Sequence, residues 1–172
     1  MDTTALLAEL EDEANSTRRL LERVPTDRLD WAPHERSMTL GQLALHVAQV
    51  PGTFAHILAG DAVDFSTVDF GAPAEGDPRD ILEILDESVC GARQWLAGLD
   101  DARAGAPYRA RVGPVELFTV PRHVLVRSLM FNHWYHHRGQ LTVYLRLLDV
   151  PLPPLYGPTA DENPFGGPPA AP

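Results

Sequence analysis

The chain has 172 residues, of which 44% are hydrophobic, and this length and composition suit one domain with a sizeable core. All 14 basic residues are arginine and stand against 24 acidic residues, so the net charge of -10 argues against nucleic acid as the main partner. The absence of lysine excludes Schiff-base and P-loop chemistry.

Cellular location is indicated by three further features of the sequence. Cys90 is the only cysteine, so no intrachain disulfide can form and a cytoplasmic location is natural. The first residues lack a basic segment followed by an apolar one, and we therefore expect no signal peptide. Every apolar run is too short or too charged to span a bilayer, so we expect no membrane association.

Two amphipathic helices are predicted in the first third of the chain. The first covers residues 4–24, begins with Thr3 or Thr4 as its cap, and is ended by proline. The second covers residues 39–60, and Thr39 with Gln42 fits a capping box at its start. Pro51 falls within this helix, where we expect it to cause a kink or a break.

A long crossover at residues 61–76 leads to the third predicted helix, residues 77–99. Asp77 as cap and Pro78 at the first position indicate its start, and its periodicity predicts that Cys90 is a buried structural thiol. Residues 108–118 alternate around a Gly-Pro pair and predict a short hairpin. We expect no other strands.

The fourth predicted helix, residues 119–149, carries the most informative pattern. His133 and His137 are four residues apart and therefore project from the same helix face. That face is otherwise apolar, and burying two imidazoles there is costly unless their nitrogens are satisfied. A divalent metal ion would satisfy them, and His46 on the apolar face of the second helix is the best third ligand. The alternative is a hydrogen-bonded cluster of core histidines.

Other residues of the fourth helix support separate expectations. His136 points about 100° away from its neighbour and should not be a ligand. Arg138 is expected to bind a cofactor or anionic ligand, and Gly139 to permit close approach by another helix or a ligand. The remaining arginines of this helix should pair with acidic neighbours: Arg122, Arg127 and Arg146.

Three segments together resemble the DinB/YfiT-like family: Ser37 to Ala48 (SMTLGQLALHVA), Asn132 to Arg146 (NHWYHHRGQLTVYLR) and Leu155 to Glu162 (LYGPTADE). The resemblance implies an all-α, four-helix bundle of up-down-down-up topology over residues 1–163, while we expect residues 164–172 to form a flexible tail. It also implies a divalent metal held by three histidines, which correspond to His46, His133 and His137, and frequent homodimers. Family members with established activity are transferases or isomerases that use low-molecular-weight thiols.

Function is left with three hypotheses. The first is a metal-dependent enzyme that transfers a low-molecular-weight thiol onto a small electrophile. The second is a hydrolase in which metal-bound water is the nucleophile. The third is a non-catalytic metal-binding protein of the stress response. Zinc and nickel both accept histidine ligands, and because ligation needs neutral imidazoles, acidification below about 6.5 should favour metal release.

Overall fold

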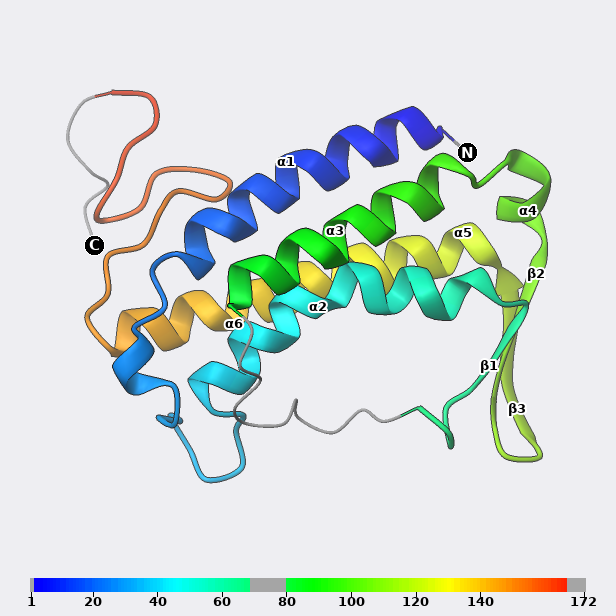
Figure 1. Cartoon of the computed structure of the whole chain (residues 1–172), viewed down its shortest axis with the longest axis horizontal. Coiled ribbons are helices and arrows are strands. Elements are labelled where there is room, and N and C mark those ends of the chain that lie inside the picture. Colours follow the sequence, from blue (N-terminus) through cyan, green and yellow to red (C-terminus); the bar gives the residue numbers. More distant parts are fainter. Residues whose placement is uncertain (1, 69–79, 167–172) are drawn as a thin grey trace.

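The computed structural model describes residues 2–68 and 80–166, which form a bundle of four long helical segments (Figure 1). The long helices are α1 (Thr3–Leu21), α2 (Leu40–Ala59), α3 (Ile81–Ala97) and α6 (His133–Leu147), the last continuing from the short α5 (Arg122–Leu125) and a π-helical segment η2 (Val126–Asn132). Figure 1 shows α1 and α5–α6 running one way and α2 and α3 the other, so the up-down-down-up four-helix prediction is confirmed. Two further short helices, η1 (Thr26–Arg28) and α4 (Asp101–Gly105), lie in connections.

Capping residues set where these helices begin. Thr39 and Gln42 form the expected capping box, with the Gln42 backbone N–H donating to Thr39 Oγ1 at 3.2 Å and the Thr39 N–H to Gln42 Oε1 at 2.9 Å. The first helix differs from expectation, because Asp2 rather than a threonine accepts the Ala5 N–H. The third helix is capped by Asp80; the predicted start at Asp77 and Pro78 lies outside the described residues.

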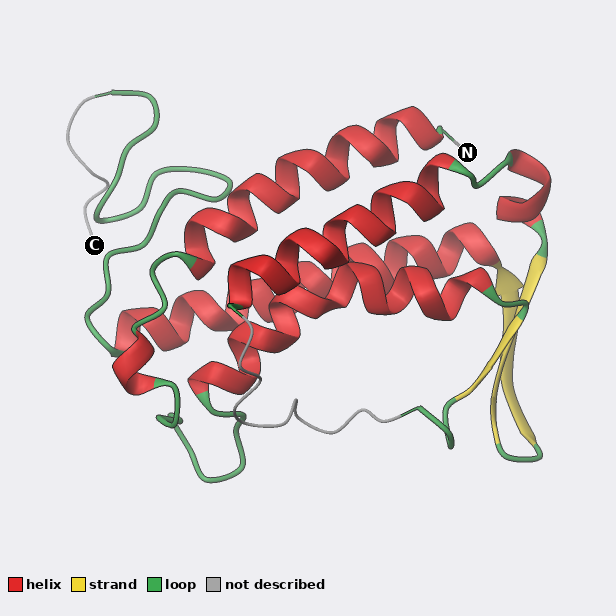
Figure 2. Ribbon diagram, in the orientation of Figure 1, coloured by secondary structure: helices red, strands yellow, loops and turns green. Residues whose placement is uncertain are grey.

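The three-stranded sheet of the described chain lies at one end of the bundle (Figure 2). The predicted hairpin is confirmed as β2 (Pro107–Val112) paired antiparallel with β3 (Val115–Pro121), and Gly113 in the turn has a φ of 55°. The expectation that strands occur only there is wrong, because β1 (Ala62–Asp64) adds parallel to β2. A three-residue strand is too short to produce an alternating pattern in the sequence. Residues 119–121 also belong to β3 rather than to a helix.

A buried arginine joins the sheet to the bundle. Arg122 is 1% exposed, and its guanidinium donates to the Leu58 carbonyl at 2.5 Å, to the Arg103 carbonyl at 3.2 Å and to Asp61 at 2.8 Å. It also lies 5.2 Å from the centre of the Tyr108 ring. The expected acidic partner of Arg122 is therefore present, and those of Arg127 (Glu9) and Arg146 (Asp161) are present as well.

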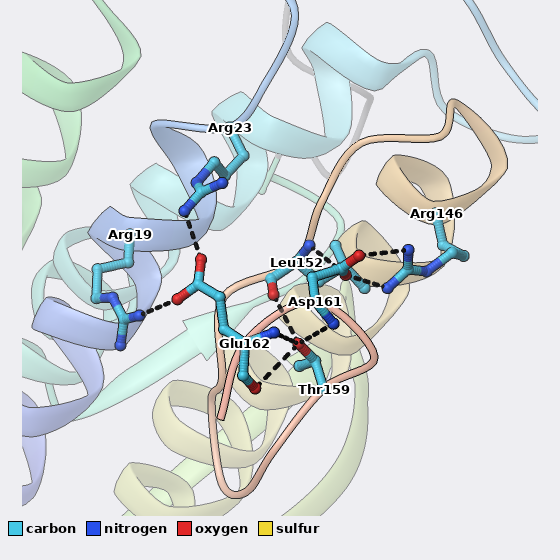
Figure 3. Close-up of polar contacts among 7 residues, drawn as sticks. All are labelled: Arg19, Arg23, Arg146, Leu152, Thr159, Asp161 and Glu162. Carbon is cyan, nitrogen blue, oxygen red and sulfur yellow. Dashed lines mark hydrogen bonds and ion pairs between the residues drawn. The ribbon is translucent and has the colours of Figure 1, made fainter. Parts of the chain in front are cut away.

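The segment after α6 returns along the bundle and is held by ion pairs (Figure 3). Glu162 accepts from Arg19 at 3.1 Å and from Arg23 at 2.6 Å, both on or just after α1. Asp161 pairs with Arg146 of α6 and accepts the Leu152 backbone N–H at 2.9 Å. Of the predicted tail, residues 167–172 lie outside the described residues.

Two further expectations about single residues are corrected. Cys90 is exposed rather than buried, because it lies one position after the buried Val89 and so about 100° around α3 from the core. A β-carbon at Gly139 would meet nothing within 4 Å in the described chain, so no helix of the same chain approaches it closely. No described helix is long and apolar enough to cross a membrane.

Candidate metal centre

The site lies between α2 and α6, where the structure brings His46, His133 and His137 together. One ring nitrogen from each histidine lies within 4.8 Å of those of the other two, a spacing that could hold a metal ion. The Nε2 atoms of His46 and His133 are 3.1 Å apart. Two nitrogens bound at about 2.0–2.1 Å to one tetrahedral ion lie about 3.3 Å apart, so this pair is already close to the separation that zinc would require.

Ring packing holds the three imidazoles in place. The ring centres of His46 and His137 are 4.4 Å apart, and those of His133 and His137 are 4.5 Å apart, with interplanar angles of 89° and 67°. Phe54 of α2 packs edge-on against His133 at 5.3 Å. All three histidines are partly exposed, so the cluster lies at the edge of the core rather than within it.

The surroundings keep the imidazoles neutral. Burial and the neighbouring histidines lower the pKa of His46 to about 4, and burial with His137 and His136 lowers the pKa of His133 to about 4. Burial also lowers the pKa of His137. Neutral imidazole is the form that binds metal. Because these pKa values are lowered, protons compete with a metal ion for the histidines only well below the pH of about 6.5 expected for an unperturbed histidine.

A hydrogen bond between the two helices lies directly beside the histidines. Pro51 has no N–H to donate to the Val47 carbonyl one turn earlier, and the indole of Trp134 donates to that carbonyl instead, at 2.8 Å. Val47 follows His46 and Trp134 follows His133, so this bond joins α2 and α6 one residue away from a histidine on each helix. Pro51 does not break α2, which is continuous from Leu40 to Ala59.

Packing of α2 against α3 also compensates for the proline. Ser88 Oγ accepts the Gly52 N–H at 2.8 Å and donates to the Gln49 carbonyl at 3.1 Å. A β-carbon at Gly52 would lie 2.9 Å from Ser88 Cα, so the glycine permits this contact. No sequence pattern beyond the proline itself indicates these roles.

Arg138 lies away from the three histidines. It is 1% exposed, pairs with Glu13 of α1, donates to Thr17 Oγ1 at 3.1 Å, and its guanidinium carbon is 5.3 Å from the centre of the Tyr135 ring and 5.2 Å from that of Tyr156. Like the other arginines of this helix, Arg138 therefore has an acidic partner, which was not expected from the sequence. Arg138 follows His137 by one residue, which is about 100° of rotation around the helix, so its side chain faces α1 rather than the histidine cluster. Its binding of a cofactor stays a prediction, and an anion there would compete with Glu13.

His136 is exposed, and the cluster of three does not include it. Its ring centre is 4.9 Å from that of His137, close enough for its charge to lower the pKa values of His133 and His137. Gln140 is a contact that the sequence did not suggest, because its Oε1 lies 2.7 Å from His137 Nδ1.

Comparison with known proteins now decides the family. The model of the DinB family matches residues 1–164. The chain belongs to the DinB family. Its relatives include the uncharacterized protein YrdA of Bacillus subtilis (strain 168), which is 27% identical over 154 residues, covering 88% of this chain and 86% of YrdA.

Solved DinB-like structures show the same fold. That of YjoA from Bacillus subtilis has a TM-score of 0.68 at 21% identity, covering 88% of this chain and 97% of YjoA. A DinB-like protein from Bacillus cereus ATCC 10987 has a TM-score of 0.64 at 21% identity, covering 87% of this chain and 95% of its own. These matches support the architecture of this DinB-family protein.

Proposed function

We propose that this DinB-family protein binds one divalent ion, zinc or nickel, through His46, His133 and His137, and that it transfers a low-molecular-weight thiol onto a small electrophile. The observation that carries this proposal is the convergence of three neutral imidazole nitrogens between α2 and α6. Among the described residues, no fourth side chain joins these three nitrogens, and three nitrogen ligands resemble a catalytic site, which keeps a coordination position open.

The chemistry of the cluster favours thiol transfer over hydrolysis. A divalent ion held there would lower the pKa of a thiol, so that its sulfur could attack an electrophile near neutral pH. Neutral imidazoles leave the positive charge of the ion uncompensated, which strengthens this effect. The cluster contains no carboxylate, so none of its side chains offers the general base that a metallohydrolase commonly uses to activate water.

Metal binding is tested by elemental analysis after metal loading and desalting. We expect one equivalent of metal in the wild-type protein, a sharp loss in His133→Ala, and near wild-type content in the matched control His136→Ala. Equal metal content in wild type and His133→Ala would end the three-histidine proposal. Loss in His136→Ala alone would place the ligands on another face of α6.

The reaction is tested with metal-loaded protein and a panel of low-molecular-weight thiols and electrophiles. Metal-dependent consumption of both thiol and electrophile supports thiol transfer. Turnover of esters or amides without a thiol would support the hydrolase instead. Stoichiometric metal binding with no turnover across both panels would support the non-catalytic, stress-related role.

We also propose that the protein is a cytoplasmic homodimer. Gly139, Val143 and Leu147 are spaced four residues apart on the outer face of α6, and Val143 and Leu147 are 58% and 57% exposed. An apolar stripe beside a glycine suits close packing of a second copy. An exposed free thiol at Cys90 suits the reducing cytoplasm.

A further inference from the structure

Gln140 of α6 lies beside the three histidines but is not one of the proposed metal ligands. It follows His137 by three residues on α6, so the two side chains share a helix face. Its Oε1 lies 2.7 Å from His137 Nδ1, within the usual range of a hydrogen bond. We propose that Gln140 is a positioning residue, which accepts the His137 Nδ1–H and thereby leaves Nε2 of this histidine to bind the metal.

The inference follows from the two tautomers of neutral imidazole. One ring nitrogen carries the proton and the other carries the lone pair that binds a metal. An amide oxygen can only accept, so a hydrogen bond between His137 Nδ1 and Gln140 Oε1 requires the proton on Nδ1. The lone pair of His137 then resides on Nε2. Without the acceptor, the tautomer that protonates Nε2 competes with the one that can bind a metal through Nε2.

His137 has particular need of such a contact. The Nε2 atoms of His46 and His133 are 3.1 Å apart, so a shared proton, which a metal ion would replace, directs these two rings toward each other, and Phe54 packs against His133. Hydrogen bonds from a ligating histidine to an outer acceptor fix ring orientation and commonly change metal affinity about 10–100-fold. Gln140 is exposed, and water competes for its amide, so we expect an effect at the lower end of this range.

The test compares three variants of the full chain. Gln140→Leu removes the acceptor at similar size, Gln140→Glu keeps an acceptor at the same reach, and Gln94→Leu makes the same change on the exposed face of α3. The readouts are the dissociation constant for Co²⁺, followed by its visible absorption, and the 15N shifts of the His137 ring in the metal-free protein.

We expect Gln140→Leu to weaken Co²⁺ binding about tenfold and to lower the population of the Nδ1–H tautomer of His137. Gln94→Leu should bind Co²⁺ with a dissociation constant within about twofold of wild type. Gln140→Glu should bind Co²⁺ within about twofold of wild type or more tightly. Unchanged affinity and ring shifts in Gln140→Leu would overturn the inference. So would a Gln140→Glu variant as weak as Gln140→Leu, because its acceptor is retained. Gln140→Asn, whose shorter side chain should not reach Nδ1, replaces the leucine variant if that one does not fold.

This inference rests on the metal-binding part of the proposed function, and the outcomes of the two remain distinguishable. Co²⁺ binding that depends on Gln140, without any thiol transfer, would leave the inference standing and end the proposed reaction. Thiol transfer together with Co²⁺ binding that does not depend on Gln140 would support the proposed reaction and end the inference about Gln140. A wild-type protein that binds no Co²⁺ would overturn both.

Discussion

The hydrogen bond from Trp134 to the Val47 carbonyl should depend on Pro51, and this dependence can be measured. Trp134 and Val47 are both fully buried, and Pro51 cannot donate to the carbonyl. Trp134→Phe therefore leaves a buried carbonyl without its donor, which costs about 1–3 kcal/mol, in addition to the cost of the smaller side chain. In a Pro51→Ala background, the restored backbone N–H of residue 51 can donate to the Val47 carbonyl within the helix. The cost of leaving that carbonyl unpaired should then largely disappear.

A double-mutant cycle isolates this term. The free energy of unfolding of metal-free wild type, Trp134→Phe, Pro51→Ala and the double variant is measured with urea and far-ultraviolet circular dichroism. We expect a coupling free energy of about 1–2 kcal/mol between the two positions. Trp95→Phe on α3 is the matched control and should be additive with Pro51→Ala. Additivity of Trp134→Phe with Pro51→Ala, within about 0.5 kcal/mol, would refute the reasoning.

Three further predictions concern charge and assembly. The pKa of His46 is about 4 in the folded protein and near 6.5 when unfolded, so the unfolded state binds more protons between these values and metal-free stability should fall as pH falls through this range. Urea titrations at about pH 7 and about pH 5 should show a smaller loss for His46→Gln, and an equal loss would contradict the prediction. Arg138→Met should cost on the order of 3 kcal/mol by unpairing the Glu13 carboxylate, and adding Glu13→Gln should restore most of it; no restoration would mean that the charge pair is not the cause. Light scattering at micromolar concentration should give a dimer mass that Val143→Glu converts to a monomer, and a wild-type monomer would refute the dimer.

Helix positions were readable from the sequence because several local signals agreed. In α2, the periodic apolar face and the capping box at Thr39 indicate the same start, and the structure has the helix begin at Leu40. The hairpin could be predicted for the same reason, since alternation and the Gly113 turn coincide. Signals that act alone were less reliable: Thr3 and Thr4 were the expected caps of the first helix, but they are its first two residues and Asp2 provides the cap.

Features that depend on contacts distant in the sequence could not be predicted. β1 contains three residues, and its partner strand β2 begins only after the whole of α3 and α4. The position of Arg138 next to the histidine pair drew attention to it in the sequence, but only the packing of α6 against α1 shows that Glu13 and Thr17 surround it. A helix pattern gives the direction of a side chain around its own axis, but the partner on the neighbouring helix depends on how the helices are aligned.

The candidate site shows the same division. Spacing of four residues placed His133 and His137 on one face, and the apolar face of α2 indicated His46, so the members of the cluster could be named from the sequence. Their separation depends on how far α2 is displaced along α6, and the sequence pattern leaves that displacement free. In the structure, one buried bond beside the candidate ligands joins the two helices, from Trp134 to the Val47 carbonyl that Pro51 leaves free. A proline that costs stability within an isolated helix thus leaves free the carbonyl that accepts this bond between the two helices carrying the candidate ligands.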